Sequence, residues 1–225
     1  MEHLRISHFR GIQQGELRGF QKLNLLMGPN NSGKSAVLEA LYLLESPQPL
    51  NVAFLPFEQD PSYAQMLLST EDQLALSIDE YGDGTRSAMK MLLMLIAVAN
   101  RATPERPGLF LWEEPELFQN PRMLKKMLEE LVRIIQHRPV QVFIATHSLE
   151  VMGLLLKLTE EGTLPPNDLK AYRLQLKSGV LTSSWYSRDN LLTWLQEGLD
   201  PRIWGDFYVP LRFYWPSQTE ETLLA

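Results

Sequence analysis

The chain has 225 residues, 44% of them hydrophobic and 21% charged, and its formal net charge is −6. This composition is typical of one globular domain with ample apolar material for a core, and the lack of cysteine excludes disulfides and thiolate metal sites. Because neutralising phosphates requires Lys and Arg, the acidic balance argues against a free-standing protein that binds mainly to the nucleic-acid backbone.

The first third of the chain predicts strands and a helix around a glycine-rich loop. Residues 3–12 alternate imperfectly between apolar and polar side chains, as a half-buried strand does. The run LNLLM at 23–27 is continuously apolar, which is typical of a buried parallel strand. Residues 34–45 place apolar side chains on one helical face. Beyond them we expect a proline-broken loop at 46–62 and a helix at 63–79.

The rest of the chain alternates helices with apolar strands. We expect helices at 84–100, 121–137 and 149–162, strands at 108–112 and 139–148, and two strands around the Ser-Gly turn at 178–179. Such alternation predicts an α/β fold with a mostly parallel core sheet.

We divide the chain into two parts. The core covers residues 1–160 and includes a short helical subdomain at about 46–90. The C-terminal part, residues 161–225, holds a β-hairpin and an aromatic-rich tail that we expect to pack on the core.

The glycine-rich loop fits the phosphate-binding pattern G-x-x-x-x-G-K-[ST], between a predicted strand and a predicted helix. Glycines let consecutive N–H groups turn toward phosphate oxygens, and the helix start adds its positive dipole end. The lysine reaches the β- and γ-phosphates, and the following hydroxyl ligates Mg²⁺. We therefore expect a nucleoside triphosphate to be held by Gly28, Pro29, Asn30, Asn31, Ser32, Gly33, Lys34 and Ser35.

Two later strands end in side chains that suit the same site. The strand GLFLW is followed by Glu113 and Glu114, and in such a pair one carboxylate holds Mg²⁺ while the next polarises the attacking water. An acidic helix start is the alternative reading. The strand VFIATHS ends at His147, at the edge of a parallel sheet where ligands bind, although a structural histidine is the alternative there.

The segment YGDGTRS immediately precedes the helix expected at 84–100. Its functional reading is a second anion-binding helix start, made by Gly82, Asp83, Gly84 and Thr85, that closes over a triphosphate from the other side. The alternative is an ordinary helix start with Asp83 or Thr85 as N-cap.

The order of these motifs resembles that of the ATP-binding-cassette (ABC) type heads of the AAA-family ATPases. Within that superfamily the chain is most similar to the stand-alone ATPases related to RecF, the SMC proteins and the overcoming-lysogenization-defect (OLD) nucleases. The segment HFRGI…FQKLNLLMGPNNSGKSAVLEAL is very close to their amino-terminal pattern, and EEPELFQNP is similar to their Asp-Glu-Pro-Glu-x-x-Leu-His-Pro. The resemblance covers most of residues 4–154. It implies a P-loop NTPase head with an antiparallel N-terminal β part and a much reduced helical subdomain.

The resemblance also implies roles for the motif residues. Ser35 and Glu113 hold Mg²⁺ beside the phosphates of ATP, Glu114 is the general base, and His147 is the switch histidine. The Gly-Asp-Gly-Thr turn belongs to the signature loop, which completes the ATP site of the opposite subunit. We therefore expect ATP to join a head-to-tail homodimer and hydrolysis to loosen it.

The chain departs from the family pattern in ways that predict secure ATP binding with slow hydrolysis. Glu113 stands where Asp is usual, Asn120 stands where His or Asp is usual, and Asp83 separates the glycines of the signature. Gln59 and Gln65 are the candidates for a lid-loop glutamine.

The spacing of the motifs predicts a pared-down head. The segment between the phosphate loop and Glu113 is too short for the coiled-coil arms of SMC proteins, and the segment beyond His147 is too short for the nuclease domain of OLD proteins. We expect an ATP switch that controls a separate effector protein in DNA repair or phage defence. The ATPase subunit of a membrane transporter, a small-molecule kinase and a non-hydrolysing scaffold are the alternatives.

Partners and location complete the expectations. Scattered basic residues near the first strands (Arg5, Arg10, Arg18 and Lys22) are candidate DNA contacts, and the aromatic tail is either core or a docking patch. The amino terminus lacks the apolar region of a signal peptide, and the longest apolar stretch, residues 91–99, is too short to span a bilayer. We expect a cytoplasmic protein without a membrane partner.

Overall fold

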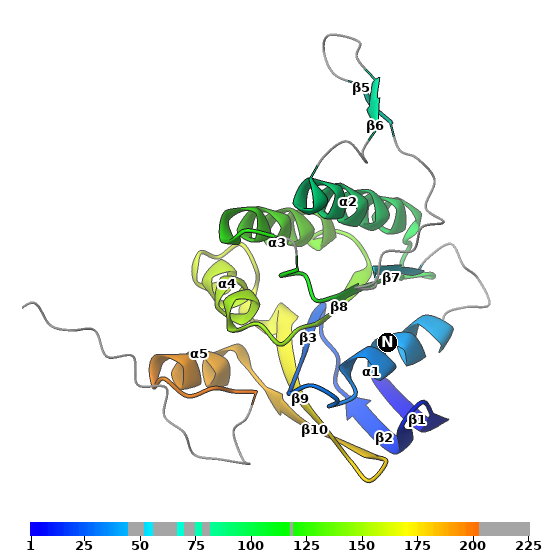
Figure 1. Ribbon diagram of the computed structural model, residues 1–225, viewed down its shortest axis with the longest axis vertical. Coiled ribbons are helices and arrows are strands. Elements are labelled where there is room, and N and C mark those ends of the chain that lie inside the picture. Colours follow the sequence, from blue (N-terminus) through cyan, green and yellow to red (C-terminus); the bar gives the residue numbers. More distant parts are fainter. Residues whose placement is uncertain (45–51, 56–66, 70–74, 78–81, 118, 203–225) are drawn as a thin grey trace, which may run out of the picture.

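The computed structural model describes residues 1–44, 52–55, 67–69, 75–77, 82–117 and 119–202. An eight-stranded mixed sheet organises them, in the order β1-β2-β10-β9-β3-β8-β7-β4 (Figure 1). Its strands are β1 (His3–Phe9), β2 (Ile12–Arg18), β3 (Leu23–Met27), β4 (Val52–Leu55), β7 (Gly108–Glu113), β8 (Val140–Ala145), β9 (Leu169–Lys177) and β10 (Val180–Tyr186).

The strand directions confirm the expected α/β fold. From β9 through β3, β8 and β7 to β4, every neighbouring pair is parallel. β1 and β2 pair antiparallel, as the N-terminal part was expected to do. The sheet is thus parallel from β9 to β4 and mixed toward the β1 edge, where β10 pairs parallel with β2 and antiparallel with β9.

Helices cover both faces of the sheet (Figure 1). On one face lies α1 (Lys34–Leu44), and on the other lie α2 (Asp83–Arg101), α3 (Pro121–Ile135) and α4 (Leu149–Glu160). Among the described residues, the last helix is α5 (Arg188–Gln196), which follows β10. The helices expected from sequence in these segments are confirmed as α1, α2, α3 and α4. Each of them carries a stripe of apolar residues three or four positions apart, which packs in the core on its face of the sheet.

The central strands separate two apolar cores, which explains the unbroken apolar run of β3. Successive side chains of a strand point to opposite faces. Leu25 of β3 belongs to the core under α2, α3 and α4, whereas Leu26 belongs to the core around α1. All five residues of β3 are therefore buried.

The C-terminal hairpin lies inside the main sheet. β9 pairs with β3 on one side and with β10 on the other, and β10 also pairs with β2. Ser178 and Gly179 both have positive φ (49° and 78°), which suits a tight hairpin turn. The two strands expected around this turn are confirmed. The division of the chain at residue 160 remains a proposal, although the hairpin supplies strands to the core sheet.

Two predictions from sequence are wrong between α1 and α2. Part of the expected proline-broken loop forms β4, which pairs parallel with β7. Part of the helix expected at 63–79 forms the antiparallel pair β5 (Leu67–Ser69) and β6 (Ala75–Ser77). In both cases backbone pairing with a partner strand outweighs a local pattern that was proline-broken or mixed.

Some expectations lie outside the described residues. They concern Gln59 and Gln65 as lid-loop candidates, and the aromatic residues beyond position 202. Within the described ranges, no helix combines the length and the apolar character that crossing a membrane requires.

Candidate nucleotide site

Three neighbouring parallel strands bring the sequence motifs to one edge of the sheet. In the strand register, Leu26 of β3 lies beside Ala145 of β8, which lies beside Glu113 of β7. The backbone continues this alignment past the strand ends, because Glu114 N donates to Ala145 O over 2.8 Å and Thr146 N donates to Leu26 O over 3.0 Å. The phosphate loop, the carboxylate pair and the histidine loop therefore start side by side.

The phosphate loop has a backbone that only its glycines allow. Gly28 and Gly33 have φ values of 148° and 93°. A Cβ atom at Gly28 would lie 2.6 Å from the carbonyl oxygen of Leu174 in β9, so the close approach to β9 also requires glycine. α1 begins directly after this loop at Lys34, and its first turn contains no acidic residue that would offset its dipole.

The lysine of the loop is buried and turned inward. Lys34 Nζ donates to the carbonyl oxygens of Gly28 and Pro29, each over 3.0 Å. Burial lowers the pKa of this ammonium, while the carboxylates of Glu114, Glu113 and Glu116 act in the opposite direction. Nearby, the buried Oγ of Ser32 has no hydrogen-bond partner. A buried cation and an orphaned hydroxyl in a glycine loop fit the phosphates of a nucleotide.

A hydroxyl and a carboxylate stand where Mg²⁺ is expected. Ser35 Oγ donates a short hydrogen bond to Oε1 of Glu113. Among the described residues there is no group of three or more His, Asp or Glu side chains that could hold a metal ion alone. This donor set fits Mg²⁺, which usually takes one or two protein oxygens and completes its shell with water and substrate phosphates.

Glu114 and His147 approach each other from adjacent strand ends. His147 Nδ1 lies 3.0 Å from Glu114 Oε1 and 3.9 Å from Glu116 Oε1. The first distance would suit a hydrogen bond, but the ring nitrogen is not aligned for one. Glu114 also has a positive φ of 48°, a backbone strain that is most common at functional sites.

Sequence reasoning missed two polar residues in the loop after β7. Glu116 Oε1 accepts from Thr146 Oγ1 over 2.8 Å, so a third carboxylate lies beside the histidine loop. Gln119 Nε2 donates to the carbonyl oxygen of Gly84 over 2.9 Å, which ties the same loop to the start of α2. The repeated acids of EEPE were a signal for Glu116, whereas no local pattern indicated Gln119.

The Gly-Asp-Gly-Thr turn forms the start of α2 and remains accessible. The N-cap is Gly82 without a side-chain cap, so the alternative with Asp83 or Thr85 as N-cap is wrong. Asp83 exposes 57% of its side chain and pairs with Arg86 over 3.5 Å. Thr85 is exposed as well. The turn is therefore open to a second molecule, and Gln119 links it to the loop after β7 in its own chain.

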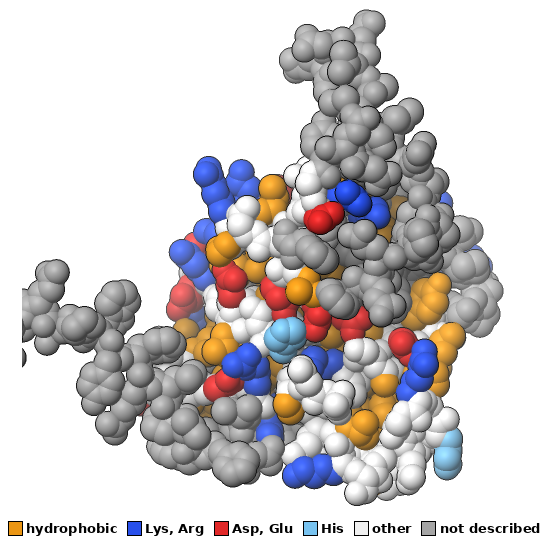
Figure 2. Space-filling view, viewed as in Figure 1, with side chains coloured by type: hydrophobic (Ala, Val, Ile, Leu, Met, Phe, Trp, Pro, Cys, Tyr) orange, Lys and Arg blue, Asp and Glu red, His pale blue; other side chains and the backbone are white. Residues whose placement is uncertain are grey.

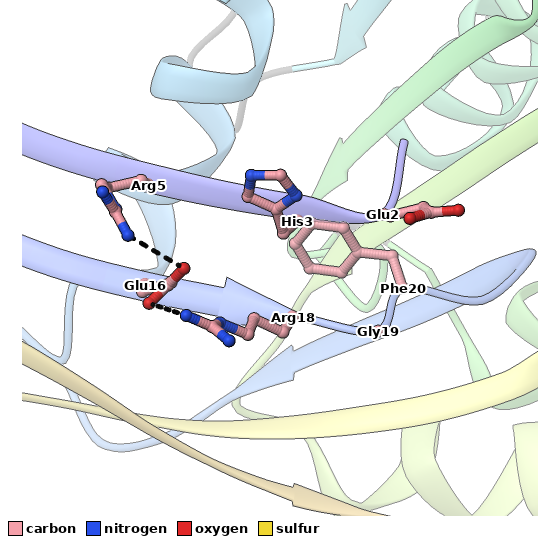
Figure 3. A pocket seen from close by; sticks show the side chains of 7 residues that line it. All are labelled: Glu2, His3, Arg5, Glu16, Arg18, Gly19 and Phe20. Atoms are coloured by element: carbon pink, nitrogen blue, oxygen red, sulfur yellow. Dashed lines mark hydrogen bonds and ion pairs between the residues drawn. The ribbon is translucent and has the colours of Figure 1, made fainter.

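Acidic side chains gather near the middle of one face, beside a histidine (Figure 2). A separate pocket of about 590 Å³ lies at the outer ends of β1 and β2 (Figure 3). In that pocket Glu16 pairs with Arg18 over 2.9 Å and with Arg5 over 3.7 Å, and its pKa is lowered chiefly by the hydrogen bond from Arg18. The carboxylate of Glu16 is therefore engaged by two arginines of the same pocket.

The other candidate DNA contacts are also engaged within the chain. Arg10 pairs with Glu39 over 2.6 Å, and Lys22 Nζ donates to the carbonyl oxygen of Gln136 over 2.8 Å. With Arg5 and Arg18 bound to Glu16, all four basic residues have partners, and they do not form an unpaired basic surface.

Comparisons with known proteins agree with this geometry. Residues 45–153 match the family described as "AAA domain, putative AbiEii toxin, Type IV TA system". An ATP/GTP phosphatase of Helicobacter pylori is 46% identical over 44 residues, and RecF of Proteus mirabilis, a DNA replication and repair protein, is 48% identical over 44 residues. Each match covers 20% of this chain and only 12% of the relative's length.

A solved structure extends the likeness to most of the fold. CbiO1 of Clostridium perfringens, a part of the ABC transporter complex cbiONQ, superposes with a TM-score of 0.54 over 85% of this chain and 89% of its own, at 12% identity. Identity this low shows a common fold and not a common function. With the P-loop edge described above, the chain is similar in fold to the ATPases of ABC transporters, and over 44 residues it is similar in sequence to RecF.

Proposed function

We propose that this protein is an ATP-driven switch that forms a head-to-tail homodimer around ATP, hydrolyses it slowly and thereby controls a separate effector protein. The observation that supports this most strongly is the convergence of Lys34, the Ser35–Glu113 pair and the Glu114–His147 pair at one sheet edge. Each of these groups answers one chemical need of phosphoryl transfer to water.

The residues divide the reaction among them. Residues 28–33 wrap the phosphates with backbone N–H groups, and Lys34 neutralises the β- and γ-phosphate charge. Bound Mg²⁺ would supply charge neutralisation of the β- and γ-oxygens, held by Ser35 and Glu113. Glu114 accepts a proton from the attacking water, and His147 contacts the γ-phosphate from the adjacent strand end.

The dimer follows from the incomplete enclosure of the triphosphate. The described part of one chain presents donors from one side, and water on the open side would weaken every electrostatic contact. The start of α2 is exposed, and its N-cap, Gly82, has no side chain to cap the first N–H groups. These N–H groups are a second set of donors for the γ-phosphate bound by the other subunit. Gln119 joins this start to the loop that carries Glu116, so each site can sense the state of the other.

Glu113 supports slow turnover. A glutamate in place of aspartate carries one more methylene, and Mg²⁺ tolerates poor octahedral geometry badly. A non-hydrolysing scaffold is therefore the second candidate. The likeness to a transporter ATPase rests on the fold alone and gives no separate support for a transport role.

Light scattering after size-exclusion chromatography tests the proposal. We expect wild type and Glu114→Gln to be monomers without nucleotide, wild type to dimerise transiently with Mg-ATP, and Glu114→Gln to remain dimeric. Phosphate release should be measurable in wild type and lost in the variant. Monomers under all conditions would exclude the switch, whereas a stable wild-type dimer without phosphate release would favour the scaffold.

A further inference from the structure

The loop of His147 is held by a chain segment that lies far away in sequence. Arg202, beyond the end of α5, donates a short hydrogen bond from Nη1 to the carbonyl oxygen of His147. Sequence motifs give no hint of this contact, because 55 residues separate the two positions. It joins the C-terminal part of the described chain to the ATP edge of the sheet.

Hydrogen bonds to Asp200 fix the orientation of the Arg202 guanidinium, which also contacts the histidine loop. Its Nε donates to both carboxylate oxygens of Asp200, over 2.8 and 3.0 Å, and its Nη2 also contacts Asp200. The backbone N–H of Arg202 donates to the same carboxylate over 2.9 Å. The side chain of Asp200 is only 5% exposed and that of Arg202 is 27% exposed, so the carboxylate is shielded from water while the guanidinium is partly accessible.

A third residue anchors this pair to the sheet. Arg173 of β9, which is 9% exposed, donates from Nε to the carbonyl oxygen of Arg202 over 3.0 Å. Because β9 pairs with β3, the strand that leads into the phosphate loop, the segment at Arg202 is fixed relative to the nucleotide edge. The network therefore has a rigid base and one donor aimed at His147.

The ring of His147 needs such support, because its own side chain has little. It is 45% exposed, and Nδ1 approaches Glu114 without hydrogen-bond alignment. On either side, Thr146 is bonded to Leu26 and Glu116, and Ser148 caps α4. At His147 itself, the backbone carbonyl oxygen accepts the hydrogen bond from Arg202.

We propose that Arg202, locked by Asp200, is a positioning residue that orients His147 toward the γ-phosphate side of the site. The inference deepens the proposed function and rests on it for its effect on turnover.

The direct test observes the histidines by NMR at fixed pH in the absence of nucleotide. The chain has four histidines, and the signal that disappears in His147→Gln is that of His147. We expect Arg202→Gln to shift or broaden the imidazole signals of His147 and to leave those of His3, His8 and His137 in place. Arg202→Lys should give a smaller change, because one ammonium cannot contact Asp200 and the carbonyl as a planar guanidinium does.

The control removes an arginine of similar burial from a different contact. Arg188 at the start of α5 is bonded to Thr159, Asp189 and Glu160, and Arg188→Gln should not move the His147 signals. Asp200→Asn provides a second variant if Arg202→Gln does not fold. It keeps the arginine but weakens the hydrogen bonds that hold the guanidinium in place. Unchanged His147 signals in either folded variant would overturn the inference.

Turnover gives the second readout. We expect Arg202→Gln to lower kcat for ATP by about 10-fold while ATP affinity stays within about 2-fold, because misplacing one reacting group affects the chemical step more than binding. A parallel loss of affinity and thermal stability with unchanged kcat would indicate a structural role and overturn the inference. If wild type releases no phosphate, the proposed hydrolysis fails, and the NMR result alone decides the role of Arg202.

Discussion

The two halves of the sheet contribute differently to the site. The parallel half, from β3 to β7, supplies the groups that are suited to chemistry, namely the phosphate loop, the carboxylates and His147. The curled half, made of β1, β2, β9 and β10, supplies the surface against which the phosphate loop packs, and we call this surface the wall. The carbonyl oxygen of Leu174 and the side chain of Leu181 lie against the positions of Gly28 and Gly33. A phosphate loop therefore needs a second region that holds its backbone in place.

Glu114→Gln should separate the two halves most clearly. The substitution keeps the size of the side chain but removes the base, so we expect kcat for ATP to fall by roughly 10²-fold or more. ATP affinity and thermal stability should stay close to wild type. Phosphate release and nucleotide titration measure both effects, and substantial residual turnover would show that another group acts as the base.

Gly28→Ala should break the contact between the halves. Alanine would strain the backbone at a φ of 148° and place its Cβ against β9, so we expect ATP to bind about 10-fold more weakly or worse. Gly153→Ala is the matched control, because that glycine lies in α4 with open space around it. The control should keep its affinity and gain up to about 1 kcal/mol of stability. Equal affinity in both variants would refute the role of the wall.

Leu181→Ala should weaken the wall alone. Leu181 is 3% exposed and belongs to the core around α1, so its truncation should cost about 2–5 kcal/mol of unfolding free energy. Val180→Ala, at an exposed neighbour on the same strand, should cost far less. Denaturant unfolding measures both, and similar losses would mean that burial at Leu181 does not support the loop.

The smallest effect is expected from the titration of Asp200. Burial raises the pKa of this carboxyl, but the hydrogen bonds and charge of Arg202 outweigh it and hold the pKa below its ordinary value. A lowered pKa contributes stability above the unfolded value, and that contribution is lost as the pH falls through the folded value. Wild type should therefore lose stability below about pH 4 more steeply than Asp200→Asn. Parallel acid unfolding curves would contradict this assignment.

The chemical half was largely predictable from sequence, since each of its motifs is a short local pattern. The loop at 28–35, Glu113 with Glu114, and His147 each follow an apolar strand, and parallel strands align such ends at one edge. Their individual roles remain proposals. The fold class, too, followed from the alternation of strands and helices.

The remaining features depend on partners that are distant in the chain. The segment of β4 (Val52–Leu55) looked like a loop because prolines and polar residues flank it in the sequence, and its pairing partner, β7, lies some fifty residues later. The insertion of β9 beside β3 is set by non-local pairing as well. Gln119 and Arg202 each contact their target through one hydrogen bond to a backbone carbonyl. Because every residue has such a carbonyl, these contacts leave no pattern in the sequence.

The central claim is that the start of α2 in one chain covers the phosphate loop of another. The chain contains no cysteine, so single cysteines can report this contact without background. Asn30→Cys and Thr85→Cys lie at exposed positions of the loop and of the turn, and Lys157→Cys on α4 serves as the control partner. Each variant would also carry Glu114→Gln to retain ATP.

Mixing the Asn30→Cys and Thr85→Cys chains with a short bis-maleimide should give a cross-linked dimer that requires Mg-ATP. Asn30→Cys mixed with Lys157→Cys should not cross-link. An ATP-dependent 30–85 cross-link is the result our account predicts. Its absence in a preparation that binds ATP, or an equal yield with the Lys157→Cys control, would contradict the head-to-tail switch.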